Sequence, residues 1–203
     1  ISFSVEMLSS LSTLPEDEQR LVEIVLKESE RLNSLITNFL CFARPERIRP
    51  EPVDLRDAIE EILMLAKKLP DFHDTIKIKK HFTSEAKIYV DSQQIKQVLW
   101  NLLINAIQAM PDGGTLTTTL RSTIALNGVE AVAIEVTDTG SGIDSANLQR
   151  IFDPFFTTRD SGTGLGLSVV HRIVENHSGR ITVQSRKGQG TTFTIILPKG
   201  QAP

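Results

Sequence analysis

Apolar residues recur at intervals of three and four along residues 1–42, which predicts a pair of helices. The first ends near Leu14, and Pro15 with the acidic residues that follow it predicts the start of the second. The second helix keeps a heptad spacing that only Glu28 interrupts; its apolar positions are Leu21, Val25, Leu32, Leu35, Phe39 and Phe42. Two such hairpins would close into a four-helix bundle in a homodimer. A single amphipathic helix packed on the following domain is the alternative interpretation.

Prolines interrupt the helical pattern after residue 44 and predict a linker over 47–52. The linker would separate a helical domain, residues 1–46, from a second domain, residues 53–200. In the second domain helical spacing and strand alternation succeed each other: helices are predicted at 54–69, 92–110 and 167–176, and strands at 75–81, 86–90, 115–124, 130–137, 181–185 and 191–197. The strands are expected to be mainly antiparallel. The predicted fold class is therefore α+β, a two-layer α/β sandwich preceded by a helical hairpin.

The predicted helix at 92–110 is apolar on nearly every side except for one line of amides. They follow each other at steps of three and four: Gln94, Gln97, Asn101, Asn105 and Gln108. A buried amide without a partner costs about 1–3 kcal/mol, so such a row needs water, another protein group or a ligand. The row favours a bound polar ligand, and a solvated stripe on a partly exposed helix is the alternative.

Glycines gather between Asp138 and Ser168, a segment that holds five of the chain's twelve. The second group of them runs directly into the helix predicted at 167–176. Free N–H groups and the positive end of the dipole at a helix start bind anions, so this position predicts a phosphate site. Taken alone, the same pattern is also typical of a glycine-rich surface turn.

Composition excludes several classes of function. The net charge of -3, from 22 Lys and Arg against 25 Asp and Glu, gives no overall basic field for nucleic acid or an anionic membrane. The single cysteine, Cys41, excludes an internal disulfide and fits a reducing compartment, so a cytoplasmic location is expected. No apolar run reaches membrane-spanning length, and no membrane contact is predicted. The start at Ile1, without an initiator methionine, indicates a piece of a longer protein, whose attachment to an inner membrane the sequence leaves open.

Four motifs in this order resemble the N, G1, F and G2 boxes of sensor histidine kinases. They are Asn101-x-x-x-Asn105, Asp138-x-Gly140-x-Gly142, Phe152-x-x-Phe155-Phe156 and Gly162-x-Gly164-x-Gly166-Leu167. These kinases belong to the ATPase superfamily with the Bergerat fold that includes gyrase, Hsp90 and MutL. The resemblance covers about residues 50–198, and the hairpin resembles the kinases' dimerisation and phosphotransfer bundle. The segment Asn105-Ala-Ile-Gln-Ala-Met110 is most similar to the corresponding segment in the nitrogen-regulation group of these kinases.

The resemblance implies that ATP and Mg²⁺ are the cofactors. Asp138 would accept a hydrogen bond from the adenine amino group, and Asn105 would give an oxygen to Mg²⁺. The other nucleotide-binding residues that it implies are Asn101, Gly140, Gly142, Ile143, Phe152, Thr163, Gly164, Leu165, Gly166 and Leu167. Residues 143–161 would form a lid, whose Arg150 and Arg159 are candidate catalytic residues that neutralise charge on the transferred phosphoryl group. For each arginine a solvated surface position is the alternative.

Asn101, also a candidate catalytic residue, distinguishes kinase from hydrolase. Gyrase-like ATPases, as the resemblance has it, place a glutamate there to activate water, and an amide is a poor general base. Asn101 therefore favours transfer of the γ-phosphoryl to a histidine of the dimerisation domain, for relay to an aspartate of a response-regulator receiver domain. A non-catalytic ATP-binding dimer scaffold and an ATPase are the alternatives. The acceptor-histidine motif is missing; the four histidines present are interpreted as surface or packing residues: His73, His81, His171 and His177.

Overall fold

The computed structural model describes residues 48–82, 86–125, 128–159 and 162–200, together with six positions between 18 and 29. The chain divides into two compact units, Ile1–Glu46 and Arg47–Pro203. All six described positions of the first unit are helical: Glu18, Leu21, Val22, Ile24, Val25 and Ser29. The rest of the predicted hairpin lies outside the described residues, so the hairpin and its dimer stay predictions.

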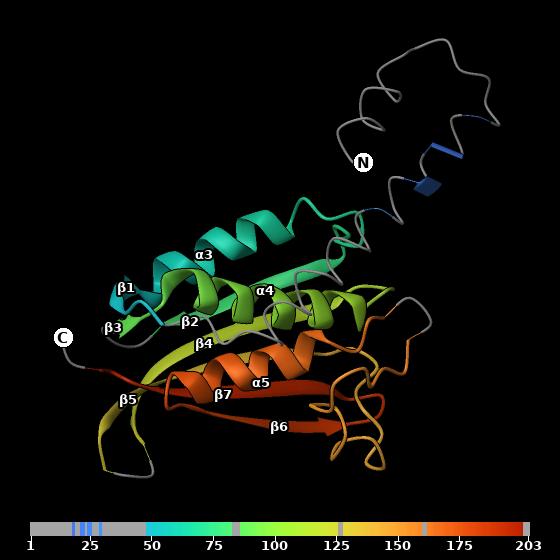
Figure 1. The fold of residues 1–203 in the computed structure, drawn as a ribbon. Coiled ribbons are helices and arrows are strands. Elements are labelled where there is room, and N and C mark those ends of the chain that lie inside the picture. Colours follow the sequence, from blue (N-terminus) through green and yellow to red (C-terminus); the bar gives the residue numbers. More distant parts are fainter. Residues whose placement is uncertain are drawn as a thin grey trace. The chain divides into compact units, whose positions relative to one another are not determined.

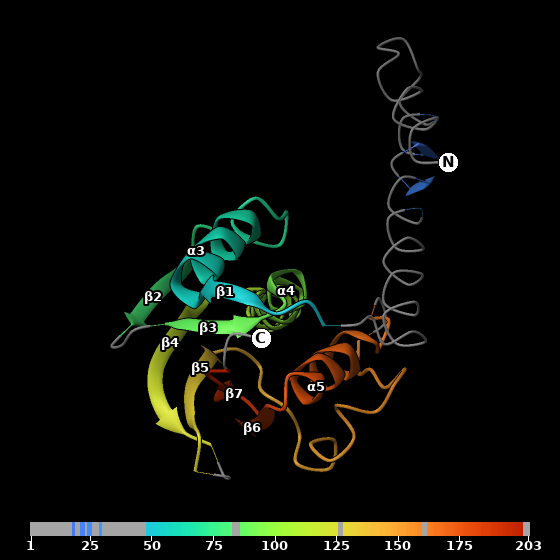
Figure 2. The same ribbon diagram turned by 60° about the vertical axis from the view of Figure 1, so that its left-hand side comes forward.

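The second unit has two layers, with three helices on one face of a five-stranded sheet (Figures 1 and 2). The helices are α3 (Leu55–Ala66), α4 (Ser92–Gln108) and α5 (Gly166–Asn176). The strands of the sheet, in spatial order, are β2 (Ile76–Phe82), β4 (Gly114–Ile124), β5 (Glu130–Asp138), β7 (Gly190–Pro198) and β6 (Arg180–Arg186). Only β2 and β4 are parallel neighbours within this sheet. The predicted α+β sandwich, with mainly antiparallel strands, is confirmed.

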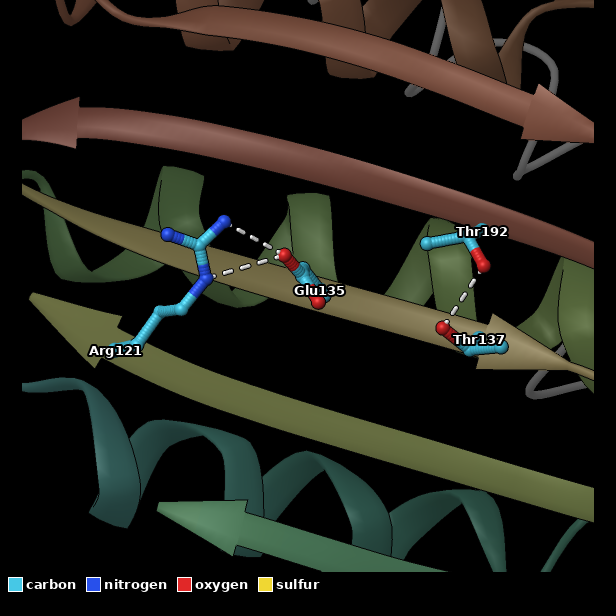
Figure 3. A network of polar contacts seen from close by, with 4 residues as sticks. All are labelled: Arg121, Glu135, Thr137 and Thr192. Atoms are coloured by element: carbon cyan, nitrogen blue, oxygen red, sulfur yellow. Dashed lines mark hydrogen bonds and ion pairs between the residues drawn. The ribbon is translucent and has the colours of Figure 1, made fainter. Parts of the chain in front are cut away.

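The period-two alternation of β5 decides where its last residue lies. Ile134 is paired with Leu120 of β4 and Ile195 of β7, and all three are at most 1% exposed. Side chains two residues apart share a face of a sheet, so Asp138 lies on the same face as Ile134. The intervening residue Thr137 is on the opposite face, where Figure 3 shows it bonded to Thr192 with the helices behind the strands. The strand therefore delivers a carboxylate to the face that the helices cover.

A second sheet of two strands, β1 (Glu51–Asp54) and β3 (Lys87–Val90), is the main difference from the sequence prediction. Residues 51 and 52 were expected in the linker, but Pro52 is paired with Tyr89 in β1. A proline without an N–H group is tolerated on an edge strand, and β1 has only one neighbour. The described residues 48–50 are not helical, and the proline at position 52 did not prevent a short strand.

Helix α4 is fixed between α3 and α5. Asp91 caps it by accepting from Gln94 N at 3.1 Å, as Asp54 caps α3 by accepting from Arg56 N. One side of α4 is fully buried: Ile95, Val98, Leu99, Leu102, Leu103, Ala106 and Ile107. The amides on its remaining side are thus carried by a rigid helix. None of the helices in the described ranges combines the length and apolar character needed to cross a membrane.

Candidate nucleotide site

Asp138 is a buried carboxylate at the end of β5, only 5% exposed. Its Oδ1 accepts hydrogen bonds from Gly140 N at 2.8 Å and Thr191 N at 3.3 Å. Burial raises the pKa of Asp138, while these two N–H groups and the charge of Arg159 act in the opposite direction. No donor among the described residues bonds the other oxygen, Oδ2. The carboxylate is therefore held by one oxygen and can accept a ligand's donor with the second.

The turn that follows Asp138 packs on protein backbone, and this explains its glycines. A Cβ on Gly140 would lie 2.3 Å from the oxygen of Ala109, the C-cap residue of α4, which also accepts from Ser141 N at 2.9 Å. Gly142 has a φ of 65°, and a Cβ there would lie 2.1 Å from Arg186 O. The resemblance assigned these glycines to nucleotide binding. In the structure they allow close approach of the chain to itself, which holds Asp138 beside α4.

Asn101 lies on α4 where that helix meets the start of α5. A Cβ on Gly166, the first residue of α5, would come 3.3 Å from Asn101 Oδ1. Asn101 Nδ2 is buried and has no hydrogen-bond partner among the described residues. An unsatisfied buried donor costs about 1–3 kcal/mol, so an acceptor on a ligand would be stabilising at this position.

The N-terminus of α5 offers backbone donors beside Asn101. The N-cap residue, Leu165, makes no side-chain cap, and Thr163 Oγ1 accepts from its N–H at 3.3 Å. The N–H groups of the first turn have no acceptor within the helix, as at any helix start. Gly166 and Leu167 therefore present N–H groups where an anionic group would be stabilised.

Arg159, in the described part of the predicted lid, connects that segment to α4. Its Nη1 donates to Gln108 Oε1 at 2.6 Å, and its Nη2 donates to Asn105 O at 3.1 Å. Nη1 also lies 3.5 Å from Asn105 Oδ1. Burial lowers the pKa of Arg159, and the charges of Asp138 and Asp71 oppose that shift. A guanidinium stays protonated in proteins, so a fixed positive charge lies beside the predicted metal ligand Asn105.

Arg150 and Phe152 contact residues outside the amide row of α4. The Arg150 guanidinium lies 4.5 Å from the centre of the Phe156 ring and 3.8 Å from an Asp153 carboxylate oxygen, and its side chain is 63% exposed. The Phe152 ring lies 5.2 Å from that of His171 on α5. The structure therefore brings Arg159, but not Arg150, to the amides of α4. Within the described ranges no three His, Cys, Asp or Glu residues are grouped so that they could hold a metal ion.

Residues 90–201, more than half of the chain, match the family described as histidine kinase-, DNA gyrase B-, and HSP90-like ATPase. The chain belongs to this ATPase family. The family membership that the four motifs indicated is thereby confirmed, while the nitrogen-regulation subgroup stays a prediction.

Relatives of this ATPase-family chain include sensor histidine kinases. It is 38% identical to sensor histidine kinase ZraS of Escherichia coli strain K12 over 185 residues, which are 90% of the chain and 38% of ZraS. It is similar to the crystal structure of full-length ShkA in complex with AMPPNP, with a TM-score of 0.77, 27% identity, and coverage of 94% of this chain and 41% of that one. For histidine kinase ThkA in complex with response regulator protein TrrA the TM-score is 0.74, the identity 25%, and the coverage 98% and 56%. The chain spans less than half the length of the first curated relatives it matches.

Several residues of the ATPase-family site were missed by sequence reasoning. Thr191 holds Asp138, and Ser185 Oγ accepts from the N–H of Ile143 at 2.8 Å. Their strands lie beside the turn after β5 only because the sheet order is β5-β7-β6. Gln108 was noted as a member of the amide row and Arg159 as a candidate lid residue, but no signal in the sequence indicated that the two side chains bond each other. Asp71, in the segment after α3, had no signal at all.

Proposed function

We propose that this ATPase-family domain binds ATP with Mg²⁺ and transfers the γ-phosphoryl group to a histidine. The observation that carries the proposal is Asp138, a buried carboxylate with one oxygen held by two backbone N–H groups. Its other oxygen, Oδ2, would accept a hydrogen bond from the exocyclic amino group of adenine. Guanine has an oxygen at the corresponding position, which a carboxylate would repel, so the site would select ATP over GTP.

At the phosphate end, Asn105 Oδ1 would be a ligand of Mg²⁺. Mg²⁺ takes few protein ligands and keeps waters and phosphate oxygens, so one amide oxygen is enough from this helix. Asn101 Nδ2 and the first N–H groups of α5 would bind phosphate oxygens. Arg159 would neutralise charge on the transferred group. The other residues proposed to line the nucleotide are Gly140, Gly142, Ile143, Phe152, Thr163, Gly164, Leu165, Gly166 and Leu167.

Arg150 is proposed for the same neutralising task on the resemblance alone, and it would have to leave Phe156 to perform it. Arg159 is already beside Asn105, so it is the stronger candidate of the two.

The amide at Asn101 supports a kinase. Hydrolysis needs a general base for water, and an amide cannot take up a proton at neutral pH. A neutral histidine already has a nucleophilic lone pair, so it can attack the γ-phosphorus without such a base. We infer that the acceptor lies on a helical bundle, that residues 1–46 are part of it in a homodimer, and that residues 47–50 link it to the ATP-binding domain, which starts with β1. The phosphoryl group would then pass to an aspartate of a cytoplasmic response regulator, as the family of ZraS and the ThkA complex with TrrA suggest.

Calorimetric titration of the chain with ATP, with and without Mg²⁺, tests the nucleotide site. Radiolabelled ATP added with a helical bundle that carries an acceptor histidine tests the transfer. We expect tighter binding with Mg²⁺ and a labelled bundle. The variant Asn101→Glu supplies the carboxylate of the hydrolases, so it should raise the rate of phosphate release. Steady phosphate release by the unaltered chain without a labelled bundle would favour the ATPase alternative, and no binding by the folded chain would contradict the site.

A further inference from the structure

Three polar side chains from separate parts of the fold form a hydrogen-bonded series that ends at Arg159. Asp71 follows α3, Gln108 is the last residue of α4, and Arg159 belongs to the lid. Gln108 Nε2 donates to Asp71 Oδ2 at 3.5 Å, and Gln108 Oε1 accepts from Arg159 Nη1 at 2.6 Å. The two contacts use the two ends of the amide, its donor on the carboxylate and its acceptor on the guanidinium. The amide is therefore oriented by an anion on one side and a cation on the other.

The contacts of Arg159 differ in strength. The bond to Gln108 is short and charge-assisted, and such bonds are about twice as strong as neutral ones. The 3.5 Å contact with Asn105 Oδ1 is weak, and the 3.1 Å bond to Asn105 O is made to the backbone. Gln108 and Asp71 are both exposed, which limits their effect through solvent screening. Of the side chains that bond Arg159, Gln108 therefore contributes most.

These contacts are compatible with a metal ion at Asn105. Mg²⁺ would use Asn105 Oδ1, the weakest of the three acceptors of Arg159. The bonds to Gln108 Oε1 and to Asn105 O involve other atoms and can persist. The guanidinium can then stay next to the proposed phosphate end of the site while the metal binds.

We propose that Gln108, oriented by Asp71, is a positioning residue that holds Arg159 on α4 and so sets the rate of phosphoryl transfer rather than the affinity for ATP. The inference rests on the proposed function. An arginine has many rotamers, and ordering it before the reaction removes that entropic cost from the transition state. Charge on the transferred phosphoryl group changes most in the transition state, so misplacing the arginine should lower kcat more than it changes binding.

Hydrogen exchange of the lid segment around Arg159, measured on the chain alone, tests the positioning. Gln108→Leu should raise the exchange rate about threefold to tenfold. Gln108→Glu keeps an acceptor for Arg159 and should exchange at nearly the unaltered rate. Gln184→Leu, at an exposed position of β6, is the matched control and should have no effect. Equal exchange in Gln108→Leu and the unaltered chain would overturn the positioning role.

Transfer kinetics to an added acceptor bundle test the consequence. We expect Gln108→Leu to lower kcat about fivefold to tenfold with the Kd for Mg-ATP changed less than twofold, Asp71→Asn to have a smaller effect, and Gln108→Glu to restore most of the rate. Tighter Mg-ATP binding in Gln108→Leu would overturn the inference, because it would mean that Arg159 and the metal exclude each other. If the unaltered chain does not bind ATP, the proposed function fails, while the exchange comparison still decides whether Gln108 positions the lid.

Discussion

Asp138→Asn changes one atom at the end of β5 and separates nucleotide recognition from folding. Asparagine keeps an oxygen for the N–H groups of Gly140 and Thr191. Its NH₂ group then replaces Oδ2, the acceptor proposed for the adenine amino group. A hydrogen bond to a charged group contributes about 1.5–3 kcal/mol. In the variant the asparagine NH₂ would face the adenine amino group, and both are donors. We therefore expect ATP to bind about 10- to 150-fold more weakly, since each 1.4 kcal/mol is a factor of ten.

Asp138→Asn should weaken ATP binding without lowering the thermal stability of the fold. Because burial raises the pKa of Asp138, its carboxyl binds a proton more tightly in the folded chain than in the unfolded one. The ionised carboxylate therefore destabilises the fold at neutral pH, and its contribution worsens as pH rises from its ordinary pKa through the raised one. Asparagine removes this charge, so the Tm of the variant should equal or exceed that of the unaltered chain at pH 7. The difference should shrink on acidification, where the carboxyl of the unaltered chain is protonated.

Calorimetry with ATP and GTP, together with thermal unfolding between pH 4 and about pH 8, measures both effects across the titration window of a buried carboxyl. An asparagine NH₂ can donate to the guanine oxygen, so the ratio of ATP to GTP affinity should fall. Asp112→Asn, at an exposed position after α4, is the control and should change neither affinity nor Tm. ATP affinity within twofold of the unaltered value, or a clear drop in Tm, would refute the role assigned to Asp138.

Three further variants and one control test the packing of the domain that carries the site. Leu102→Ala empties a fully buried position of α4 and should lower the free energy of unfolding in urea by about 2–5 kcal/mol; a loss under about 1 kcal/mol would contradict the packing. Gly140→Ala places a Cβ 2.3 Å from Ala109 O and should cost about 1–3 kcal/mol and weaken ATP binding. Gly188→Ala, with a φ of 75° and open space, is its control and should cost only about 1 kcal/mol of backbone strain without affecting ATP. Arg121→Ala removes the exposed pair with Glu135 shown in Figure 3 and should change stability by less than about 1 kcal/mol, less still in high salt.

Most helices and strands of the second unit could be predicted because their signals are local. The apolar period of α4 and its cap at Asp91 depend on residues within a few positions of each other. The strand β1 had no such signal, since four residues with two prolines nearby become a strand only by pairing with β3. Helix α3 ends three residues earlier than predicted, and β2 begins and ends one residue later, because helix and strand ends depend on what they pack against.

The sequence by itself determined the chemistry of the candidate site. It supplies a carboxylate at the end of a strand, two amides at a spacing of four on one helix, and glycines before another helix. The order of the motifs and their residue types can be seen in the sequence without knowledge of the fold. They were enough to indicate the ATPase family and the part that Asp138, Asn101 and Asn105 would play in it.

Only the tertiary structure decided which of these groups work together. Arg150 and Arg159 are equivalent in the sequence, yet one lies over Phe156 and the other bonds α4. Asp138 is held by Thr191, which is 53 positions away along the chain. Such contacts depend on the order of strands and on which helix faces the lid. That order follows from burying the apolar faces of the whole unit at once, a property that no local stretch of sequence contains.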